Sequence, residues 1–368
     1  MKKKVGILTF HAAHNYGSML QTYALQRFVE SKGYDATILH LRPCAQKFMY
    51  IHPLQYLTRR KVLGLLFHTK LTIQNVKKWY LFEQFMKEHM NLSPEFINIS
   101  QLNHYIQDND FHAIITGGDQ IWNASALDFS IAYFLPFSFP KTKKISYSPS
   151  FGNEEEWKPK DCATMLKALL ADYDSLSVRD ESGSKYVSEL LGRNVPNVVD
   201  PAFLLSKENY EELAGDDPII KGDYILYYSP HPDKDIESTA ISYAKEHKLK
   251  IFTTTGEYYN CKGMKHHNNV GPKEFLNLIR HARTVCGKSF HLVVFCLILE
   301  KQFIAITGES DARMHSILQR MNLQDHAIEK GVNGAGFVLS DIDWNDVKRR
   351  LEDYITDSIN YLTNALSI

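Results

Sequence analysis

The sequence predicts an α/β protein with parallel sheets and two domains. Short apolar runs alternate with amphipathic helical stretches from the first residues to about residue 321, and this order is typical of β-α-β units. The chain has 368 residues, whereas one domain usually takes about 150. Hydrophobic residues make up 44% of the chain, which is enough to build two cores.

The first half opens with a β-loop-α-β unit. Residues 5–10 predict a buried strand. Ser18 and Gln21 form a capping-box pattern that opens a helix, and Gly33 ends that helix. Further strands are expected at 36–41, 111–116, 144–147 and 175–178, and further helices over 162–172 and 186–191.

A second alternation follows the stretch 215–223, which has the composition of a linker. Strands are expected at 224–228, 249–254, 284–286 and 303–306, and helices over 235–246, 273–282, 289–299 and 312–321. Residues 343–365 predict a last helix or helix pair. We therefore expect an N-terminal domain at 1–215, a C-terminal domain at 216–342 and a C-terminal helical segment at 343–368.

Residues 55–90 predict a helical excursion from the N-terminal domain, rich in basic and aromatic side chains. One interpretation is a set of amphipathic helices with a solvated basic face, which is the more common use of such a pattern. The other is a surface that rests on an anionic membrane. The basic residues are Arg59, Arg60, Lys61, Lys70, Lys77, Lys78 and Lys87.

Charge and cysteine usage exclude several classes of protein. Lys plus Arg and Asp plus Glu both number 42, so the chain lacks the basic excess of a nucleic-acid-coating protein, and we expect no nucleic-acid partner. The five cysteines include no C-x-x-C pair, which indicates neither a disulfide framework nor a zinc ribbon. We expect a cytoplasmic protein. The His11/His14 pair lacks nearby carboxylates in a recognised ligand pattern, so no metal is expected.

The candidate site residues cluster just after predicted strands. In chain order they are Asn15, Gly17, Gly118, Asp119, Gln120, Arg179, Lys288, Ser289 and His291, with Arg313 near the start of a later helix. The carboxyl ends of parallel strands form the edge at which open α/β sheets bind ligands. Two such domains facing each other would place these loops around one cleft.

Ser289 is predicted to cap a helix whose first backbone N–H groups favour an anion. His291 in the first turn could transfer a proton near neutral pH, or it could only cap or pack there. Arg179 could bind a carboxylate or phosphate through two parallel hydrogen bonds, or it could pair with Asp180. A helix start disfavours a cation such as Arg313 unless an anion or a carboxylate lies nearby.

Asp119 lies in the stretch GGDQIWN and could hold a sugar hydroxyl, act as a base or cap a turn. Gly118 before it allows close approach of the backbone. Trp122 could stack on a sugar ring, although tryptophan is more often a core residue. The chain has no G-x-G-x-x-G, P-loop or G-x-S-x-G motif, so the cofactors and nucleophile of those motifs are not expected.

Five segments together resemble the polysaccharide pyruvyl transferase family. They are FHAAHNYGSMLQTYALQRFVESKGYDATIL, TGGDQIWN, SVRDESG, VVDPAFLL and SFHLVVF, and they occur in the family's order between residues 5 and about 321. Gly118 stands where the family usually has serine. Gly287 and Lys288 stand where it usually has Thr-Asp, and Leu292 where it has glycine. These departures change the charge and the space beside His291.

The resemblance implies a fold like that of GT-B glycosyltransferases, with two Rossmann-like domains facing a cleft. It implies transfer of a pyruvyl group from phosphoenolpyruvate to a sugar of a surface polysaccharide or its precursor, making a ketal across two hydroxyls. The partners would be phosphoenolpyruvate as donor substrate, with no separate cofactor, and a sugar or oligosaccharide acceptor, lipid-linked if residues 55–90 touch the inner face of a membrane.

The resemblance also implies roles for single residues. His291 and Arg179 best match the donor site, and Asp119 is a candidate for binding the acceptor or for acting as a general base. The catalytic candidates are therefore His291 and Asp119. The substrate-binding candidates are Arg179, Ser289, Lys288, Arg313, Asn15, Gly17, Gly118 and Gln120. Two alternatives stay open: a nucleotide-sugar glycosyltransferase on the same fold, and a non-catalytic member that binds glycan or another assembly protein.

Overall fold

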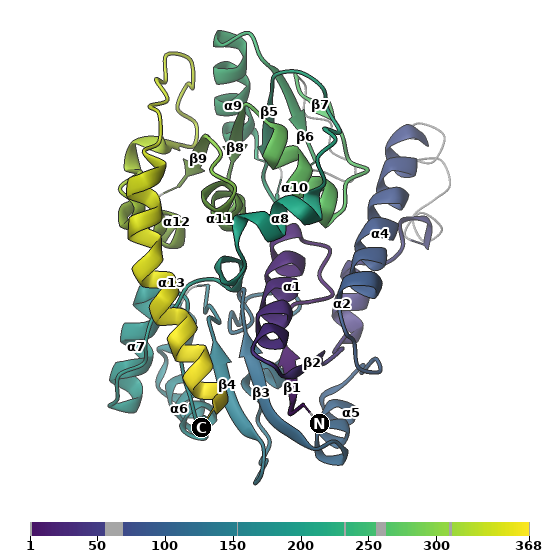
Figure 1. Cartoon of the computed structure of the whole chain (residues 1–368), viewed down its shortest axis with the longest axis vertical. Helices are drawn as coiled ribbons and strands as arrows, with labels where there is room; N and C mark the ends of the chain where they lie inside the picture. The colour runs from purple at the N-terminus through teal and green to yellow at the C-terminus, as the bar shows by residue number, and fades with distance from the viewer. Residues whose placement is uncertain are drawn as a thin grey trace. The chain divides into compact units, whose positions relative to one another are not determined.

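The computed structural model describes residues 2–55, 69–152, 154–231, 233–254, 263–308 and 311–367. The chain divides into two compact units, each with its own parallel sheet (Figure 1). Unit 1 comprises Met1–Tyr50, Met86–Leu205 and Asp353–Ile368. Unit 2 comprises Ile51–Phe85 and Ser206–Glu352. The α/β class with parallel sheets that the sequence predicts is confirmed.

The sheet of unit 1 has the strand order β2-β1-β3-β4. Its strands are β1 (Lys4–Leu8), β2 (Asp35–Ile38), β3 (Phe111–Gly117) and β4 (Lys143–Tyr147). All neighbouring pairs are parallel, so the four carboxyl ends lie at one edge of the sheet. The helices of unit 1 include α1 (Tyr16–Ser31), α2 (Cys44–Met49), α5 (Ile99–Asp108), α6 (Lys160–Ala171) and α7 (Glu181–Leu191).

The stretch 175–178 is not the regular strand that its sequence predicts. It makes only isolated bridges, between Ile145 and Ser175 and between Val178 and Asn197. Serine hydroxyls take over part of the pairing: Ser146 Oγ donates to the Ser177 carbonyl at 2.8 Å, and Ser177 Oγ donates to the Ser146 carbonyl at 2.9 Å. Such side-chain bonds to the backbone compete with a regular ladder.

An aromatic cluster fills the core of unit 1. Trp122 is fully buried and stacks on Phe134, with ring centroids 5.0 Å apart. Its indole N–H donates to the Tyr133 carbonyl at 3.1 Å, which satisfies the one polar atom of the ring. Trp122 is therefore a core residue and offers no face for a sugar to stack on.

The sheet of unit 2 has six strands in the order β10-β9-β8-β5-β6-β7, all of them parallel. The strands are β5 (Tyr224–Tyr228), β6 (Lys250–Thr253), β7 (Lys265–His266), β8 (Thr284–Gly287), β9 (Phe303–Thr307) and β10 (Ala327–Glu329). The helices include α8 (Lys207–Ala214), α9 (Lys234–Glu246), α10 (Pro272–His281), α11 (Phe290–Ile298) and α12 (Ala312–Met321).

The boundary between the units falls at Leu205 and Ser206, and not at the stretch 215–223. Helix α8 belongs to unit 2 because the Asn277 side chain on α10 donates to the Ala214 carbonyl at the end of α8, at 3.1 Å. The linker-like composition of 215–223 marks a surface turn that follows this packed helix.

Most of the predicted excursion 55–90 belongs to unit 2 and not to the N-terminal domain. Helix α4 (Thr69–His89) carries the chain across the boundary between Phe85 and Met86. Within unit 2, the Lys78 ammonium donates to the Thr254 carbonyl at 3.2 Å. Residues 56–68 of the excursion, with Arg59, Arg60 and Lys61, lie outside the described residues.

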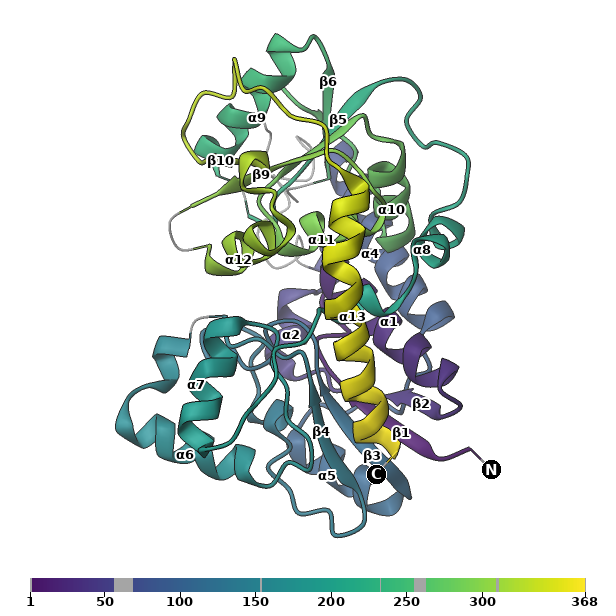
Figure 2. The ribbon, with the colours of Figure 1, turned by 60° about the vertical axis from the view of Figure 1, so that its left-hand side comes forward.

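The C-terminal residues form one helix, α13 (Trp344–Ser367), which confirms the predicted helical segment. Its first part belongs to unit 2, where Lys348 pairs with Glu300 at 3.0 Å. Its later part lies along unit 1, as Figure 2 shows near β4, and there the Tyr361 hydroxyl donates to the Ser146 carbonyl at 2.9 Å. None of the helices in the described ranges is long and apolar enough to cross a membrane.

Ser358 ties α13 to unit 1, and its removal tests this docking. The fully buried hydroxyl accepts from the Val199 N–H at 2.9 Å. Ser358→Ala should leave that N–H without its partner and lower the free energy of unfolding by about 1–3 kcal/mol. Urea unfolding followed by circular dichroism measures this. Ser367→Ala, on the exposed last turn, should change it by less than about 0.5 kcal/mol; equal effects of the two variants would contradict the docking.

Candidate functional site

In unit 1, two glycines bring the carboxyl end of β3 close to its neighbours. A Cβ atom on Gly117 would lie 1.8 Å from the Tyr147 carbonyl oxygen, and one on Gly118 would lie 1.9 Å from Gln21 Oε1. Gly118 also has a φ of +68°, a conformation that glycine adopts without strain. At Gly117 the clash is with backbone, so only glycine fits there; at Gly118 the clash is with the end of the Gln21 side chain, and it is the positive φ that favours glycine.

Asp119 follows directly, and two hydrogen bonds hold its carboxylate. Its φ is +52°, in the left-handed region that Asp tolerates better than most residues. Asp119 Oδ2 accepts from the Ser18 hydroxyl at 2.5 Å, and Oδ1 accepts from the Gln120 N–H at 2.9 Å. Both bonds fix the orientation of the carboxylate. The Gln120 side chain accepts from Asn123 Nδ2 at 2.8 Å.

Helix α1 starts three residues earlier than the capping-box pattern predicts. Asn15 is its N-cap, and the Asn15 side chain accepts from the Gly17 N–H at 2.9 Å and from the Ser18 N–H at 3.4 Å. The Gln21 amide donates to Thr9 Oγ1 at 3.0 Å instead of closing a capping box with Ser18. The Ser18 hydroxyl is thus available to Asp119, and Asn15 and Gly17 have a local role at the helix start.

Arg179 is buried in unit 1 and pairs with carboxylates. Its Nη1 atom donates to Asp200 Oδ2 at 2.8 Å, and its Nε atom lies 3.8 Å from Asp180 Oδ1. Asp200 is fully enclosed and also caps the turn that begins at Pro201, accepting from the Ala202 N–H at 3.0 Å. Burial alone would lower the pKa of Arg179, but the charges of Asp180, Asp200 and Asp119 raise it above its ordinary value.

Asp128 is a second carboxyl near Asp119, in opposite surroundings. Its side chain is largely buried, and burial raises its pKa to about 6, with a further rise from the charge of Asp119. Asp128 in turn raises the pKa of the fully buried Tyr133 hydroxyl, for which burial is the larger cause. Unit 1 therefore carries one carboxyl, Asp128, whose burial favours its neutral form.

In unit 2, the predicted start of α11 is confirmed. Ser289 is the N-cap, and its hydroxyl accepts from the Leu292 N–H at 3.4 Å. His291 lies in the first turn and is 9% exposed. The preceding Gly287 ends β8, and a Cβ atom there would lie 1.9 Å from the Tyr228 carbonyl oxygen. The glycine at this position is therefore a steric requirement of the strand end.

Lys288 forms an ion pair with Asp311 at 3.0 Å. Asp311 also accepts from the Gly308 N–H at 2.7 Å, which fixes its position after β9. Arg313 lies in the first turn of α12, two residues further on. The positive charge that Lys288 brings to the start of α11 is thus balanced by a carboxylate from the next strand–helix connection.

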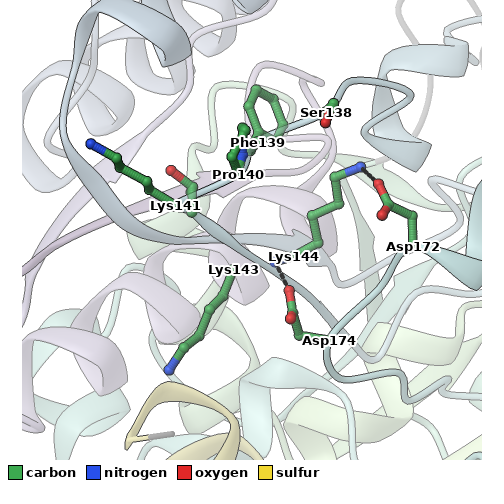
Figure 3. Close-up of a pocket in the computed structure, with 9 residues that line it drawn as sticks. Ser138, Phe139, Pro140, Lys141, Lys143, Lys144, Asp172 and Asp174 are labelled. Carbon is green, nitrogen blue, oxygen red and sulfur yellow. Dashed lines mark hydrogen bonds and ion pairs between the residues drawn. The ribbon is translucent and has the colours of Figure 1, made fainter.

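A cavity of about 270 Å³ opens at the opposite, amino end of β4 (Figure 3). Its lining includes Lys141, Lys143 and Lys144, and the Lys144 ammonium pairs with Asp172. None of the predicted site residues lines this cavity. Across the described ranges, no group of three or more His, Cys, Asp or Glu side chains could hold a metal ion.

The sequence did not single out Ser18, Asp128 and Asp200 as site residues. Asp200 had a signal, because it begins the DPAFLL part of a quoted motif. Ser18 was interpreted as a helix cap, and only the true cap at Asn15 reveals its bond to Asp119. Asp128 had no signal, because its raised pKa comes from burial, and burial cannot be inferred from the segment ALDFS.

The Arg179–Asp200 pair can be tested by breaking it from the acidic side. Asp200→Asn leaves a buried guanidinium without its closest countercharge and should lower the free energy of unfolding by about 3–5 kcal/mol. Chemical denaturation measures this. Asp180→Asn is the matched control, because its contact with Arg179 is longer, at 3.8 Å, and its effect should be smaller. A loss for Asp200→Asn no larger than the control's would contradict the pairing.

The raised pKa of Asp128 predicts a pH-dependent stability. The folded chain holds this proton up to about pH 6, whereas the unfolded chain releases it near the ordinary aspartate pKa of 3.8, so stability falls as the pH rises through this range. A rise of about two pH units corresponds to roughly 3 kcal/mol. Asp128→Asn should therefore gain stability relative to the wild type between pH 4 and pH 7, measured by thermal unfolding; a constant difference would contradict the assignment.

The chain matches the family model "Polysaccharide pyruvyl transferase" over residues 15–310. No curated protein matches it. Similar solved structures include a putative UDP-N-acetylglucosamine 2-epimerase from Listeria monocytogenes (TM-score 0.54, 9% identity, 99% of this chain and 91% of that one). The UDP complex of UGT89C1 from Arabidopsis thaliana has a TM-score of 0.50 at 11% identity, with 100% of both chains covered. AviGT4, a glycosyltransferase of avilamycin A biosynthesis, has a TM-score of 0.50 at 11% identity, over 99% of this chain and 97% of that one.

These likenesses show a GT-B-like fold, as the sequence predicts. The family match is more specific, because it spans most of the chain and includes the cap of α1, the Asp119 loop, Arg179 and the start of α11. The chain belongs to the polysaccharide pyruvyl transferase family.

Proposed function

We propose that this protein transfers a pyruvyl group from phosphoenolpyruvate to two hydroxyls of a sugar in a surface polysaccharide or its precursor, forming a ketal. The observation that carries the proposal is the family match over residues 15–310. Asp119, Arg179 and His291, which serve the proposed chemistry, all lie within the matched range.

The donor carries a phosphate and a carboxylate. In unit 2, the first backbone N–H groups of α11 and the Lys288 ammonium suit an anion. In unit 1, Arg179 suits a second anion, and its bond to Asp200 fixes the plane of the guanidinium. Because Lys288 and Arg179 are already paired with carboxylates, an anion that binds either cation has to compete with the partner of that cation, Asp311 or Asp200.

The reaction requires two kinds of proton transfer. The methylene carbon of phosphoenolpyruvate gains a proton as an acceptor oxygen bonds to the neighbouring carbon, and each acceptor hydroxyl loses its proton. His291 is the proposed acid, since imidazole titrates near neutral pH. Asp119 is the proposed base for a hydroxyl, because its carboxylate oxygens can accept a proton and the Ser18 hydroxyl and the Gln120 N–H hold it in place.

The acceptor is proposed to be a sugar or oligosaccharide, because carboxylate oxygens accept hydrogen bonds from hydroxyls. A lipid-linked acceptor would agree with the predicted membrane contact of residues 55–90. Vesicle co-sedimentation with anionic and neutral lipids tests that contact directly.

Calorimetric titration of phosphoenolpyruvate tests the donor. UDP-sugars and GDP-sugars are titrated beside it, because a nucleotide-sugar glycosyltransferase on the same fold is the alternative that the sequence leaves open. A donor present at 100 times its Kd should stabilise the fold by about 2.7 kcal/mol, which a thermal shift detects. His291→Gln should weaken this binding or abolish transfer.

The matched control is His104→Gln, on a histidine whose side chain is 79% exposed. It should bind phosphoenolpyruvate as the wild type does. Binding of a nucleotide sugar without binding of phosphoenolpyruvate would overturn the proposal in favour of glycosyl transfer. Transfer that persists unchanged in His291→Gln would remove His291 from the mechanism while leaving the donor assignment intact.

A further inference from the structure

His11 and His40 form a hydrogen-bonded pair in the interior of unit 1. His11 follows β1 and His40 follows β2, and both side chains are buried. His11 Nε2 lies 2.7 Å from His40 Nδ1, with the ring centroids 5.0 Å apart. This is the separation of a hydrogen bond; two nitrogens that shared a metal ion would lie farther apart, because each metal–nitrogen bond is about 2.1 Å long. The pair therefore shares a proton.

The bonds of His11 determine which of its nitrogens carries a proton. His11 Nδ1 lies 3.1 Å from the Thr9 carbonyl oxygen, which can only accept, so Nδ1 has to be protonated. In the neutral ring the other nitrogen, Nε2, then has a lone pair and accepts from His40 Nδ1. The bond between the two rings needs one proton between the facing nitrogens.

The pair can hold one positive charge and keep this bond. His40 Nε2 lies 3.7 Å from Glu95 Oε2, so a proton added there faces a carboxylate. A second positive charge has a different effect. When both rings are positive, each of the two facing nitrogens carries a hydrogen, neither can accept, and the bond between His11 and His40 has to break.

A continuous line of hydrogen bonds joins the histidine pair to Asp119. The Thr9 hydroxyl accepts from the Gln21 side-chain amide at 3.0 Å, and the same amide donates to the Ser18 carbonyl at 3.0 Å. The Ser18 hydroxyl donates to Asp119 Oδ2 at 2.5 Å. Because Thr9, Gln21 and Ser18 are all buried, bulk water does not replace a bond that is lost from this line.

The backbone of His40 is fixed more firmly than its partnership with His11 alone would require. Its N–H donates to Ser93 Oγ at 2.9 Å, and its carbonyl accepts from the Phe96 N–H at 2.9 Å. His40 therefore stays in place when the histidine pair separates. The loop that carries His11 and leads to the Asn15 cap of α1 is the side that we expect to move.

We propose that the His11–His40 pair is a pH switch that positions Asp119. With no charge or one positive charge, the pair stays bonded and holds the loop before α1, from which Ser18 reaches Asp119. With two positive charges the pair separates, and the Asp119 carboxylate loses its fixed orientation. Both histidines are positioning residues. The effect on transfer rests on the proposed function, whereas the switch itself is a property of unit 1.

The surroundings of the pair favour the first proton and oppose the second. Glu95, in the segment before α5, faces His40, and Lys47 on α2 pairs with Glu95. The Glu95 carboxylate attracts the first proton, whereas the charge of that proton repels the next one. On the side of His11, the Thr9 carbonyl already holds Nδ1. The switch should therefore stay closed at neutral pH and open on acidification.

Nitrogen-15 NMR of the histidine rings tests the switch in the full chain without substrate. At neutral pH, the His11 ring should be protonated at Nδ1 and accept at Nε2; the variants His11→Gln and His40→Asn assign the signals. On acidification, the backbone amide signals of Ser18 and Asp119 should shift together with the ring signals. A neutral His11 protonated at Nε2, or rings that titrate while Ser18 and Asp119 stay unchanged, would overturn the proposal.

Thr9→Val tests the route between the histidines and the site. Valine keeps the shape of the threonine side chain but removes the hydroxyl that accepts from Gln21. The histidine rings should still titrate, whereas the amide signals of Ser18 and Asp119 should no longer follow them. Signals that follow the histidines equally in Thr9→Val and in the wild type would overturn this route.

Pyruvyl transfer tests the consequence for the site. In the wild type, kcat should fall about tenfold or more over the pH range in which the second proton binds, because a small displacement of a catalytic group is costly. In His40→Asn the amide can donate to His11 or accept from it and takes up no proton, so this fall in kcat should disappear. His104→Gln, on an exposed histidine, should keep the wild-type profile.

The two proposals fail in different ways. A wild-type chain without pyruvyl transfer at any pH would overturn the proposed function, while the ring tautomers and the Ser18 and Asp119 signals would still decide on the switch. A fall in kcat that persists unchanged in His40→Asn would overturn the switch and leave the proposed function standing.

Discussion

Close approach of the backbone at two strand ends is the constraint on which both candidate sites depend. Gly117 ends β3 opposite Tyr147, and Gly287 ends β8 opposite Tyr228. At each position a Cβ atom would lie within 2 Å of the carbonyl oxygen of the paired tyrosine. A larger residue would push the strands apart and displace the Asp119 loop in unit 1 or the capped start of α11 in unit 2. A glycine that permits close backbone approach thus positions the Asp119 loop in unit 1 and the start of α11 in unit 2.

Charge compensation is the second shared feature. Arg179 is balanced by Asp200, and Lys288 by Asp311. Arg179 is buried, and burying an unpaired charge is costly, so Arg179 needs its carboxylate in the absence of ligand. The pairing also explains how Lys288 is tolerated where the family usually has an aspartate. Asp311 supplies the negative charge from the neighbouring connection, so the local sum of charges changes less than the substitution alone suggests.

The helices and strands could be predicted well from the sequence, whereas the features that depend on contacts between distant residues could not. Strand β5 and the Ser289 cap follow from local patterns, because apolar runs and capping residues act over a few positions. The cap at Asn15, the irregular stretch 175–178 and the division of α13 between units depend on partners far away in the chain. Asp128 is the clearest case, since its burial comes from the packing of its whole unit around it.

The two units differ in the charged groups at the carboxyl ends of their strands, and this difference agrees with the proposed donor and acceptor. Unit 1 offers the Asp119 carboxylate, which suits a hydroxyl that must lose its proton. Unit 2 offers a helix start with Lys288 and His291, which suits an anion that must receive one. Arg179 is the exception in unit 1, and its enclosure by Asp180 and Asp200 limits the charge that it can share. On the proposed function, unit 2 is therefore the better candidate for binding the anionic donor, and unit 1 for accepting a proton from the sugar.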